Sequence, residues 1–216
     1  SLRPAGLILP GSSMSAGALL ALSERIPLCV LDRTLDEPSI PTVRLDETDA
    51  ARQIVDHLAG QDLRRLVFFS PAPSMHESLL DERREACRDA AAEAGLDFAE
   101  VVRGDDLNAT LTSLRADSAD PFGAVVYNDV LGIDLVAAVL ASHLRPGADV
   151  AIVSYDNSPL ASRPEVALTS VDQSPDRLAE AAVAAVLAPE DAPAAHVTVP
   201  ATLVVRASSL RAPART

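Results

Sequence analysis

The chain has 216 residues, of which 48% are hydrophobic and 23% charged, so it can bury a sizeable core and has the composition of an ordinary globular protein. All 18 basic residues are arginine, and the net charge is -13. The absence of lysine excludes Schiff-base chemistry and a P-loop lysine. The acidic surface repels phosphate backbones, so this segment is not expected to grip nucleic acid by itself.

Strands and amphipathic helices alternate along the chain. Apolar runs predict strands at 5–10, 26–32, 64–70, 99–102, 122–128 and 149–156, one more strand within 166–187, and two short β-rich runs within 196–208. Helical patterns lie at 15–25, 47–61, 80–95, 107–117 and 130–144, and in the second half of 166–187. Continuous apolar strands separated by such helices are typical of parallel sheets covered on both faces. The sequence therefore predicts an α/β, doubly wound fold.

Polar residues follow almost every predicted strand. They are Gly11 to Ser13, Asp32 and Arg33, the loop 71–84, Asn128 and Asp129, Asp156 and Asn157, and Asp172 and Gln173. In open α/β sheets, ligands bind outside the carboxyl ends of the strands. Carboxylates, amides and one or two arginines at that edge suit a small ligand rich in hydroxyl or amide groups.

Catalytic and metal-binding patterns are weak in this sequence. The segment 11–17, GSSMSAG, lacks the GxSxG spacing of a nucleophile elbow, and the four histidines form no HxxxH or HExxH pair. Cys29 and Cys87 have no CxxC partner, so we expect two buried thiols of a cytosolic protein. The sequence predicts no enzyme, no cofactor and no metal, and it contains neither a bilayer-spanning apolar run nor a signal segment.

The order of the motifs resembles the effector-binding domain of LacI/GalR-type bacterial transcription regulators. The closing segments DVAIVSYDNSPLA, PEVALTSVDQSPDRLAEAAVAAVL and VTVPATLVVRASS carry this resemblance. Upstream, IPLCVLDR, VRLDETDAARQIVDHLAGQDLRRLVFFS, ERREACRDAAAEAGL and FGAVVYNDVLGIDLVAAVL follow in the order and at the spacing of that family. The resemblance covers essentially the whole chain.

The resemblance implies two Rossmann-like subdomains of the periplasmic-binding-protein-like type I fold, with a ligand cleft between them. One would comprise residues 1–72 and 174–192, and the other 73–173 and 193–216. The first βαβ unit of the family's domain, and the helix-turn-helix headpiece with its hinge, have no counterpart in this chain. The first sheet is therefore expected to have an unpaired edge, unless another chain covers it.

Four residues of the second subdomain and the crossing match ligand contacts of the family. Arg83 matches its ligand-gripping arginine, and its alternative is a surface ion pair with Asp81. Asn128 matches a polar contact, whereas Asp129 is expected to cap the helix that follows. Asp156 matches a carboxylate that accepts paired ligand hydroxyls, or it is a turn residue. Gln173 is expected at a crossing between the subdomains, facing the cleft, or else as a solvated turn residue.

Three aspartates complete the predicted effector-binding set. Asp32 and Asp46 match positions that border the cleft or couple its closure, and strand-end salt bridges are the alternative. Asp106 stands where many family members place an aromatic platform against a sugar. Because a carboxylate removes that stacking surface, a typical hexose is disfavoured and a cationic or strongly polar effector is favoured.

The function implied by the resemblance is ligand sensing and dimerisation in a cytoplasmic regulator. A small polar effector such as a sugar or nucleoside would close the lobes and alter operator binding by the upstream headpiece, not by this acidic segment. A homodimer without membrane association is expected. The alternatives are a solute-binding protein of a transport system and an α/β enzyme of small-molecule metabolism.

Overall fold

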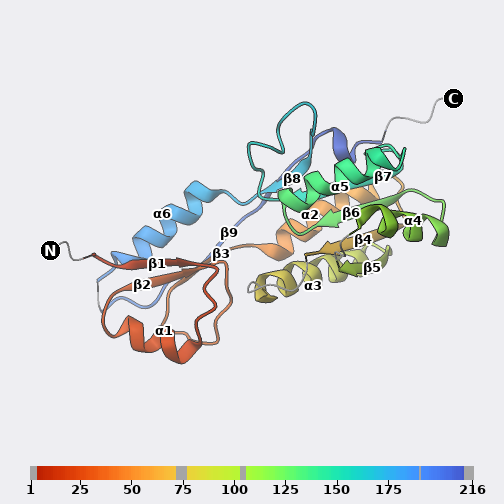
Figure 1. The fold of residues 1–216 in the computed structure, drawn as a ribbon. Helices are drawn as coiled ribbons and strands as arrows, with labels where there is room; N and C mark the ends of the chain where they lie inside the picture. The colour runs from red at the N-terminus through yellow and green to blue at the C-terminus, as the bar shows by residue number, and fades with distance from the viewer. Residues whose placement is uncertain (1–3, 72–76, 103–105, 190, 212–216) are drawn as a thin grey trace. The chain divides into compact units, whose positions relative to one another are not determined.

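The computed structural model describes residues 4–71, 77–102, 106–189 and 191–211. The predicted α/β class is confirmed, because the described residues form two separate, mostly parallel sheets flanked by helices (Figure 1). The chain divides into two compact units. Unit 1 contains residues 1–46, 75–81 and 173–201, and unit 2 contains 47–74, 82–172 and 202–216.

Unit 1 is built on a four-stranded parallel sheet in the order β1-β2-β3-β9. Its strands are β1 (Leu7–Pro10), β2 (Leu28–Leu31), β3 (Thr42–Leu45) and β9 (His196–Val199), and its helices are α1 (Ala16–Ser23) and α6 (Pro175–Val186). Successive residues of a strand face opposite sides of a sheet. Cys29 therefore packs with Leu178 and Ala182 of α6, whereas Val30 packs with Leu19 of α1.

Unit 2 is built on a six-stranded sheet in the order β10-β8-β7-β6-β4-β5, in which only β10 pairs antiparallel. Its strands are β4 (Arg65–Ser70), β5 (Asp97–Val102), β6 (Phe122–Val126), β7 (Val150–Tyr155), β8 (Thr169–Asp172) and β10 (Thr202–Val204). Its helices are α2 (Glu47–Ala59), α3 (most of Glu77–Glu93), α4 (Leu107–Asp117), α5 (Asp129–Ala141) and the short η1 (Ala207–Ser209).

The core of unit 2 lies between the sheet and helices α4 and α5. Alternate residues of β6, Phe122, Ala124 and Val126, pack there with Leu111 and Leu135 of the two helices. On the opposite face, a Cβ at Gly123 would come within 2.9 Å of Leu58 Cδ1 in α2. The continuous apolar runs of the sequence thus reflect strands buried on both faces.

The observed division differs from the predicted one at three places. The start of α3, up to Asp81, falls in unit 1, although it was predicted in the second subdomain. Helix α2 and strand β4 belong to unit 2, because β4 pairs with β5 and β6, so the boundary lies after Asp46 and not near residue 72. Strand β9 belongs to unit 1, because it pairs in parallel with β3. The sequence also missed β3 itself. Its four residues lie just after Pro41 and include a charged Arg44, so they lack the long apolar run that marked the other strands.

The turn before β7 depends on a glycine. Gly147 has a φ of 81°, and a Cβ there would clash with the carbonyl oxygen of Leu210 and lie 2.8 Å from that of Ala207. We expect Gly147→Ala to lower the free energy of unfolding by about 2 kcal/mol or more, because left-handed strain adds to a clash with backbone. Urea unfolding followed by circular dichroism measures this.

A matched substitution separates this clash from the general effect of adding a methyl group. Gly17 lies in α1, and a Cβ there would have no neighbour within 4 Å. Gly17→Ala is therefore expected to be neutral or to stabilise by about 0.5–1 kcal/mol. Equal effects of the two substitutions would contradict the assigned role of Gly147.

The short helix η1 contacts α2 through His57. Its Nε2 lies 2.8 Å from Ser209 Oγ, and Gln61 Nε2 donates to the Ser209 carbonyl at 2.7 Å. Burial lowers the pKa of His57 below its ordinary value of 6.5. The folded state therefore disfavours the imidazolium, and this group's contribution to stability is present above about pH 6.5 and is lost as the pH falls through the lowered pKa.

We expect the free energy of unfolding to decrease between pH 7.5 and 5.5, and to decrease less in His57→Gln, which keeps a polar side chain but does not titrate. Unfolding in urea at both pH values, for the wild type and the variant, measures the difference. The carboxylates contribute equally to both proteins, so an identical pH dependence would exclude His57 as a source.

Candidate functional site

The carboxyl edge of the unit 1 sheet carries Gly11, Asp32 and Asp46, one after each of β1, β2 and β3. The Asp32 amide donates to the Val43 carbonyl at 3.1 Å, and the Asp46 amide donates to Val199 at 2.8 Å. Both half-buried aspartates thus continue the backbone ladders of their strands. These bonds place the two aspartates at one edge of the sheet. Asp32 follows a strand as predicted, whereas Asp46 follows β3, which was not predicted.

Arg33 secures the loop between β1 and α1 at the same edge. Its Nη1 donates to the carbonyl oxygens of Ser12 at 2.8 Å and Met14 at 2.6 Å. Ser15 then caps α1, because its hydroxyl accepts the Ala18 amide at 3.2 Å. The guanidinium therefore holds this serine-rich loop in place beside Asp32.

In unit 2, Arg83 is buried, with only 2% of its surface exposed. Its Nε donates to Glu47 Oε1 at 3.1 Å and its Nη1 donates to the Tyr127 carbonyl at 2.9 Å. The guanidinium carbon also lies 4.2 Å from the centre of the Tyr155 ring. Arg83 thus forms a buried ion pair with Glu47, the first residue of α2. The alternative prediction, a surface ion pair with Asp81, is wrong.

The charges around Arg83 offset the cost of burying it. Burial acts to lower the pKa of the guanidinium, but Glu47 raises it, with further contributions from Tyr155 and Asp156, so that the net shift is upward. Arg83 therefore stays charged, and Asp156 lies close enough to interact with it electrostatically. Of the predicted set, the structure thus brings these two residues of unit 2 together.

The two cysteines are buried thiols, as predicted. Burial raises the pKa of Cys29 to about 11 and that of Cys87 to about 12, although a hydrogen bond with Tyr155 partly opposes the second shift. Cys87 Sγ lies 3.7 Å from the Tyr155 hydroxyl. Both thiols remain protonated at neutral pH, so neither is poised as a nucleophile.

Asn128, and not Asp129 as predicted, caps helix α5, and the predicted effector contact of Asn128 stays a prediction. Asn128 is extended, with a φ of -154°, and its Oδ1 accepts the Leu131 amide at 3.0 Å, so it is the cap of α5. A cap residue must lie outside the helix, and Asp129 is already its first residue. The Asp129 carboxylate is buried and instead accepts the hydroxyls of Ser154 and, at 2.7 Å, Ser170.

Asp156 lies on an unusual turn directly after β7. Its side chain is exposed, its φ is 106°, and Asn157 has a φ of 46°. The next strand, β8, ends at Asp172, and the chain passes from unit 2 to unit 1 between that residue and Gln173. Gln173 is therefore at a crossing, as predicted, and it is half-buried.

Asp106 has a structural role that was not predicted for it. It precedes α4, and its Oδ1 accepts the amides of Asn108 at 2.9 Å and Ala109 at 3.1 Å. The carboxylate thus caps the helix, where it also interacts favourably with the helix dipole. Its predicted contact with an effector stays a prediction.

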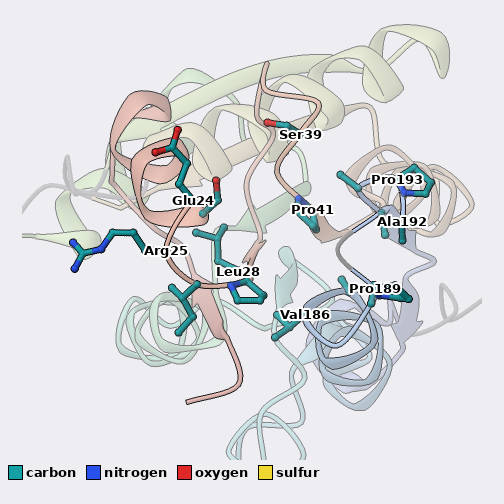
Figure 2. Close-up of a pocket in the computed structure, with 16 residues that line it drawn as sticks. Glu24, Arg25, Leu28, Ser39, Pro41, Val186, Pro189, Ala192 and Pro193 are labelled. Atoms are coloured by element: carbon teal, nitrogen blue, oxygen red, sulfur yellow. The ribbon is translucent and has the colours of Figure 1, made fainter. Parts of the chain in front are cut away.

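A cavity of about 490 Å³ lies in unit 1, at the opposite edge of the sheet from Asp32 and Asp46 (Figure 2). It is lined by residues that precede β2, β3 and β9 and by the carboxyl ends of α1 and α6, among them Arg25, Leu28, Pro41 and Val186. No residue of the predicted effector-binding set lines it. The cavity and the predicted site are therefore separate features of unit 1.

The sequence did not reveal the hydrogen-bonding partners of the residues that follow the strands, such as Glu47 for Arg83 and Arg206 for Asn157. Glu47 read only as part of an acidic first turn of a helix, and Arg206 lay in a β-rich tail. Asn157 Nδ2 donates to Asp172 at 2.9 Å, and Arg206 donates to Asn157 Oδ1 at 2.6 Å. A buried charge requires a partner, but the sequence did not show that Arg83 is buried and so did not indicate Glu47.

Comparison with known proteins gives a consistent result. Residues 55–209 match the model of the periplasmic binding protein-like domain. The HTH-type transcriptional regulator PtxS of Pseudomonas putida is 26% identical over 211 residues, which cover 94% of this chain and 61% of that protein. The chain therefore spans about three fifths of the length of this relative.

Solved structures give the same fold. A LacI transcriptional regulator from a Rhodococcus species superposes with a TM-score of 0.85 at 27% identity, covering 97% of this chain and 79% of that one. The complex of the transcriptional regulator CelR with cellobiose superposes with a TM-score of 0.75 at 23% identity, covering 94% of this chain and 65% of that one.

Proposed function

The chain belongs to the periplasmic binding protein-like domain family, and on this premise we propose that it is the effector-binding domain of a LacI-type transcription regulator. The observation that carries the proposal is the match over 94% of the chain to an HTH-type transcriptional regulator, together with the superposition on a LacI regulator at 27% identity. The effector is a small, polar, hydroxyl-rich molecule, and the protein is no enzyme.

The carboxyl edges of the two sheets support this ligand class. Asp32 and Asp46 in unit 1, and Asp156 in unit 2, supply carboxylates that accept paired hydroxyl groups. Gln173 adds an amide that both donates and accepts, and Arg83 adds a positive charge behind the unit 2 edge. Sugars present the matching pattern of adjacent hydroxyls, and a CelR relative has been solved with cellobiose.

DNA binding belongs, in this proposal, to a helix-turn-helix segment outside the 216 residues. The net charge of -13 disfavours contact between this domain and a phosphate backbone. Effector binding would change the population of a state competent for operator binding, and a homodimer would present two headpieces to two half-sites.

A transport solute-binding protein is the second candidate, because the family model also describes periplasmic binding proteins. The names of the relatives favour the regulator, since both PtxS and CelR are HTH-type transcriptional regulators. Among the described residues, no helix is long and apolar enough to cross a membrane. For a transcription regulator we propose a cytoplasmic location, on the basis of the regulator relatives.

Thermal unfolding with a sugar panel tests the ligand class. The panel comprises cellobiose, maltose, D-ribose and D-xylulose, which represent the sugars named for structural neighbours. A sugar present at about 100 times its Kd stabilises the fold by about 2.7 kcal/mol, which raises the Tm by several degrees. No shift with any of the four would contradict a sugar effector.

The variant Asp156→Asn tests whether the Asp156 carboxylate contacts the sugar. We expect this variant to lose the sugar-induced rise in Tm and to keep the Tm of the unliganded protein nearly unchanged, because the Asp156 side chain is exposed and asparagine tolerates a positive φ. Equal destabilisation with and without sugar would indicate that Asp156 is only a structural turn residue.

Mobility shift of the gene's own upstream DNA by the full-length gene product tests regulation. The expected result is a shifted band whose intensity changes when the stabilising sugar is added, whereas the 216-residue chain alone gives no shifted band. A full-length product that binds the sugar and does not bind this DNA would favour the transport candidate.

A further inference from the structure

The turn after β7 has a backbone that non-glycine residues seldom adopt. Asp156 has a φ of 106° and Asn157 a φ of 46°, both in the positive region. Such conformations persist only where the surrounding structure imposes them, and they concentrate at ligand sites. The contacts that impose this one are therefore informative about function.

Three consecutive backbone amides of the turn are each anchored to unit 2. The Asp156 amide donates to the Val171 carbonyl at 3.0 Å, and the Asn157 amide donates to Ser170 Oγ at 2.8 Å. The Ser158 amide donates to Asp129 Oδ2 at 2.6 Å. The backbone on both sides of Asp156 is thus tied to β8 and to the start of α5.

The Asn157 side chain adds a second set of bonds, to the last residue of β8 and to Arg206, which follows β10. Its Nδ2 donates to Asp172 Oδ2 at 2.9 Å, and its Oδ1 accepts Arg206 Nη2 at 2.6 Å. The other arm of the guanidinium donates to the Leu168 carbonyl at 2.6 Å. Arg206 is thus bonded both to Leu168 and to Asn157. As a charged donor, its guanidinium fixes the orientation of the Asn157 amide.

We propose that Asn157, Asp172 and Arg206 form a turn clamp that positions Asp156 for the effector, with Arg206 as the positioning residue; this rests on the proposed function. All three clamp residues are half-buried, and Asp172 and Arg206 are each hydrogen-bonded to Asn157, whereas Asp156 is exposed at the carboxyl edge of the sheet. A carboxylate held in one orientation before binding loses less conformational entropy when it accepts a pair of hydroxyls.

Hydrogen exchange of the unliganded chain tests the clamp without any effector. In Arg206→Ala, we expect the amides of Asp156 to Ser158 to exchange about tenfold faster, the equivalent of one hydrogen bond, while amides of β6 remain unchanged. Arg163→Ala is the control, because Arg163 is an exposed arginine of the same unit. Unchanged exchange at Asp156 to Ser158 would overturn the proposal.

A swap of side chains tests positioning even if Arg206→Ala fails to fold. In Asn157→Asp, the new carboxylate faces the carboxylate of Asp172, and the two repel each other. Adding Asp172→Asn gives again one amide and one carboxylate at these two positions, and residue 157 still offers Arg206 an oxygen acceptor. We expect cellobiose to bind about tenfold more weakly to the single variant and to regain its affinity in the double variant, with turn exchange following the same order.

The two kinds of failure are distinguishable. Altered exchange with unchanged cellobiose affinity would make the clamp merely structural and overturn its positioning role. Absence of binding by the wild type to cellobiose and the other panel sugars would instead contradict the proposed sugar effector, and hydrogen exchange alone would then decide whether the clamp holds the turn.

Discussion

Arg83→Ala is expected to lower the free energy of unfolding by about 3–5 kcal/mol. The substitution leaves the Glu47 carboxylate buried without its cation and removes the donor to the Tyr127 carbonyl, and breaking one half of a buried ion pair carries a cost of this order. The packing of the guanidinium on Tyr155 is lost as well. Urea unfolding of the unliganded chain measures the change.

Two further variants define the source of this cost. Arg84 lies next in the chain and forms a half-buried ion pair with Glu100 at 3.6 Å, and Arg84→Ala is expected to lower the free energy of unfolding by about 1 kcal/mol, less than Arg83→Ala. The double variant Arg83→Met with Glu47→Leu, which replaces the pair by apolar groups of similar size, should recover most of the loss. An unliganded stability unchanged by Arg83→Ala would mean that Arg83 serves the effector only.

Asp129→Ala is expected to lower the free energy of unfolding by about 3 kcal/mol. The carboxylate is 2% exposed and accepts from Ser154, Ser170 and the Ser158 amide. Alanine leaves these buried donors without an acceptor, and each unsatisfied group costs about 1–3 kcal/mol, partly relieved by rotation of the hydroxyls. Urea unfolding at neutral pH measures the change.

Asp129→Asn is the matched control, because it keeps the shape of the side chain. Its Oδ1 can accept the Ser158 amide while its Nδ2 donates to the serine hydroxyls, which can turn to accept. We expect Asp129→Asn to lower the free energy of unfolding by about 1 kcal/mol. A larger loss for asparagine than for alanine would show that a forced donor, and not a missing acceptor, is the damaging feature.

The cavity of unit 1 and the predicted effector site lie at opposite edges of one sheet. The cavity is lined largely by alanine and proline. The carboxylates that suit a hydroxyl-rich ligand lie at the other edge, where Asp32 and Asp46 follow β2 and β3. Ligands of open α/β sheets bind at the carboxyl ends of parallel strands, which is this second edge.

The sequence by itself determined the fold class and most elements, because those depend on local patterns. Apolar runs marked buried strands and amphipathic patterns marked helices, so that α4 spans Leu107–Asp117 as predicted. It also placed Asp32, Asp156 and Gln173 after strands, since position in chain order survives folding. Strand β3 was not predicted, because its four residues include an arginine and form an apolar pattern too short to indicate a strand.

Only the tertiary structure decided which residues are partners. Glu47 lies 36 positions before Arg83, and Arg206 lies 49 positions after Asn157, and no local pattern encodes pairs so distant in the chain. Strand pairing likewise assigned β4 to unit 2 and β9 to unit 1. Whether a polar side chain is exposed, caps a helix or serves as a buried acceptor depends on packing between remote segments. For this reason the sequence did not show that Asn128 caps α5 and that Asp129 is a buried acceptor.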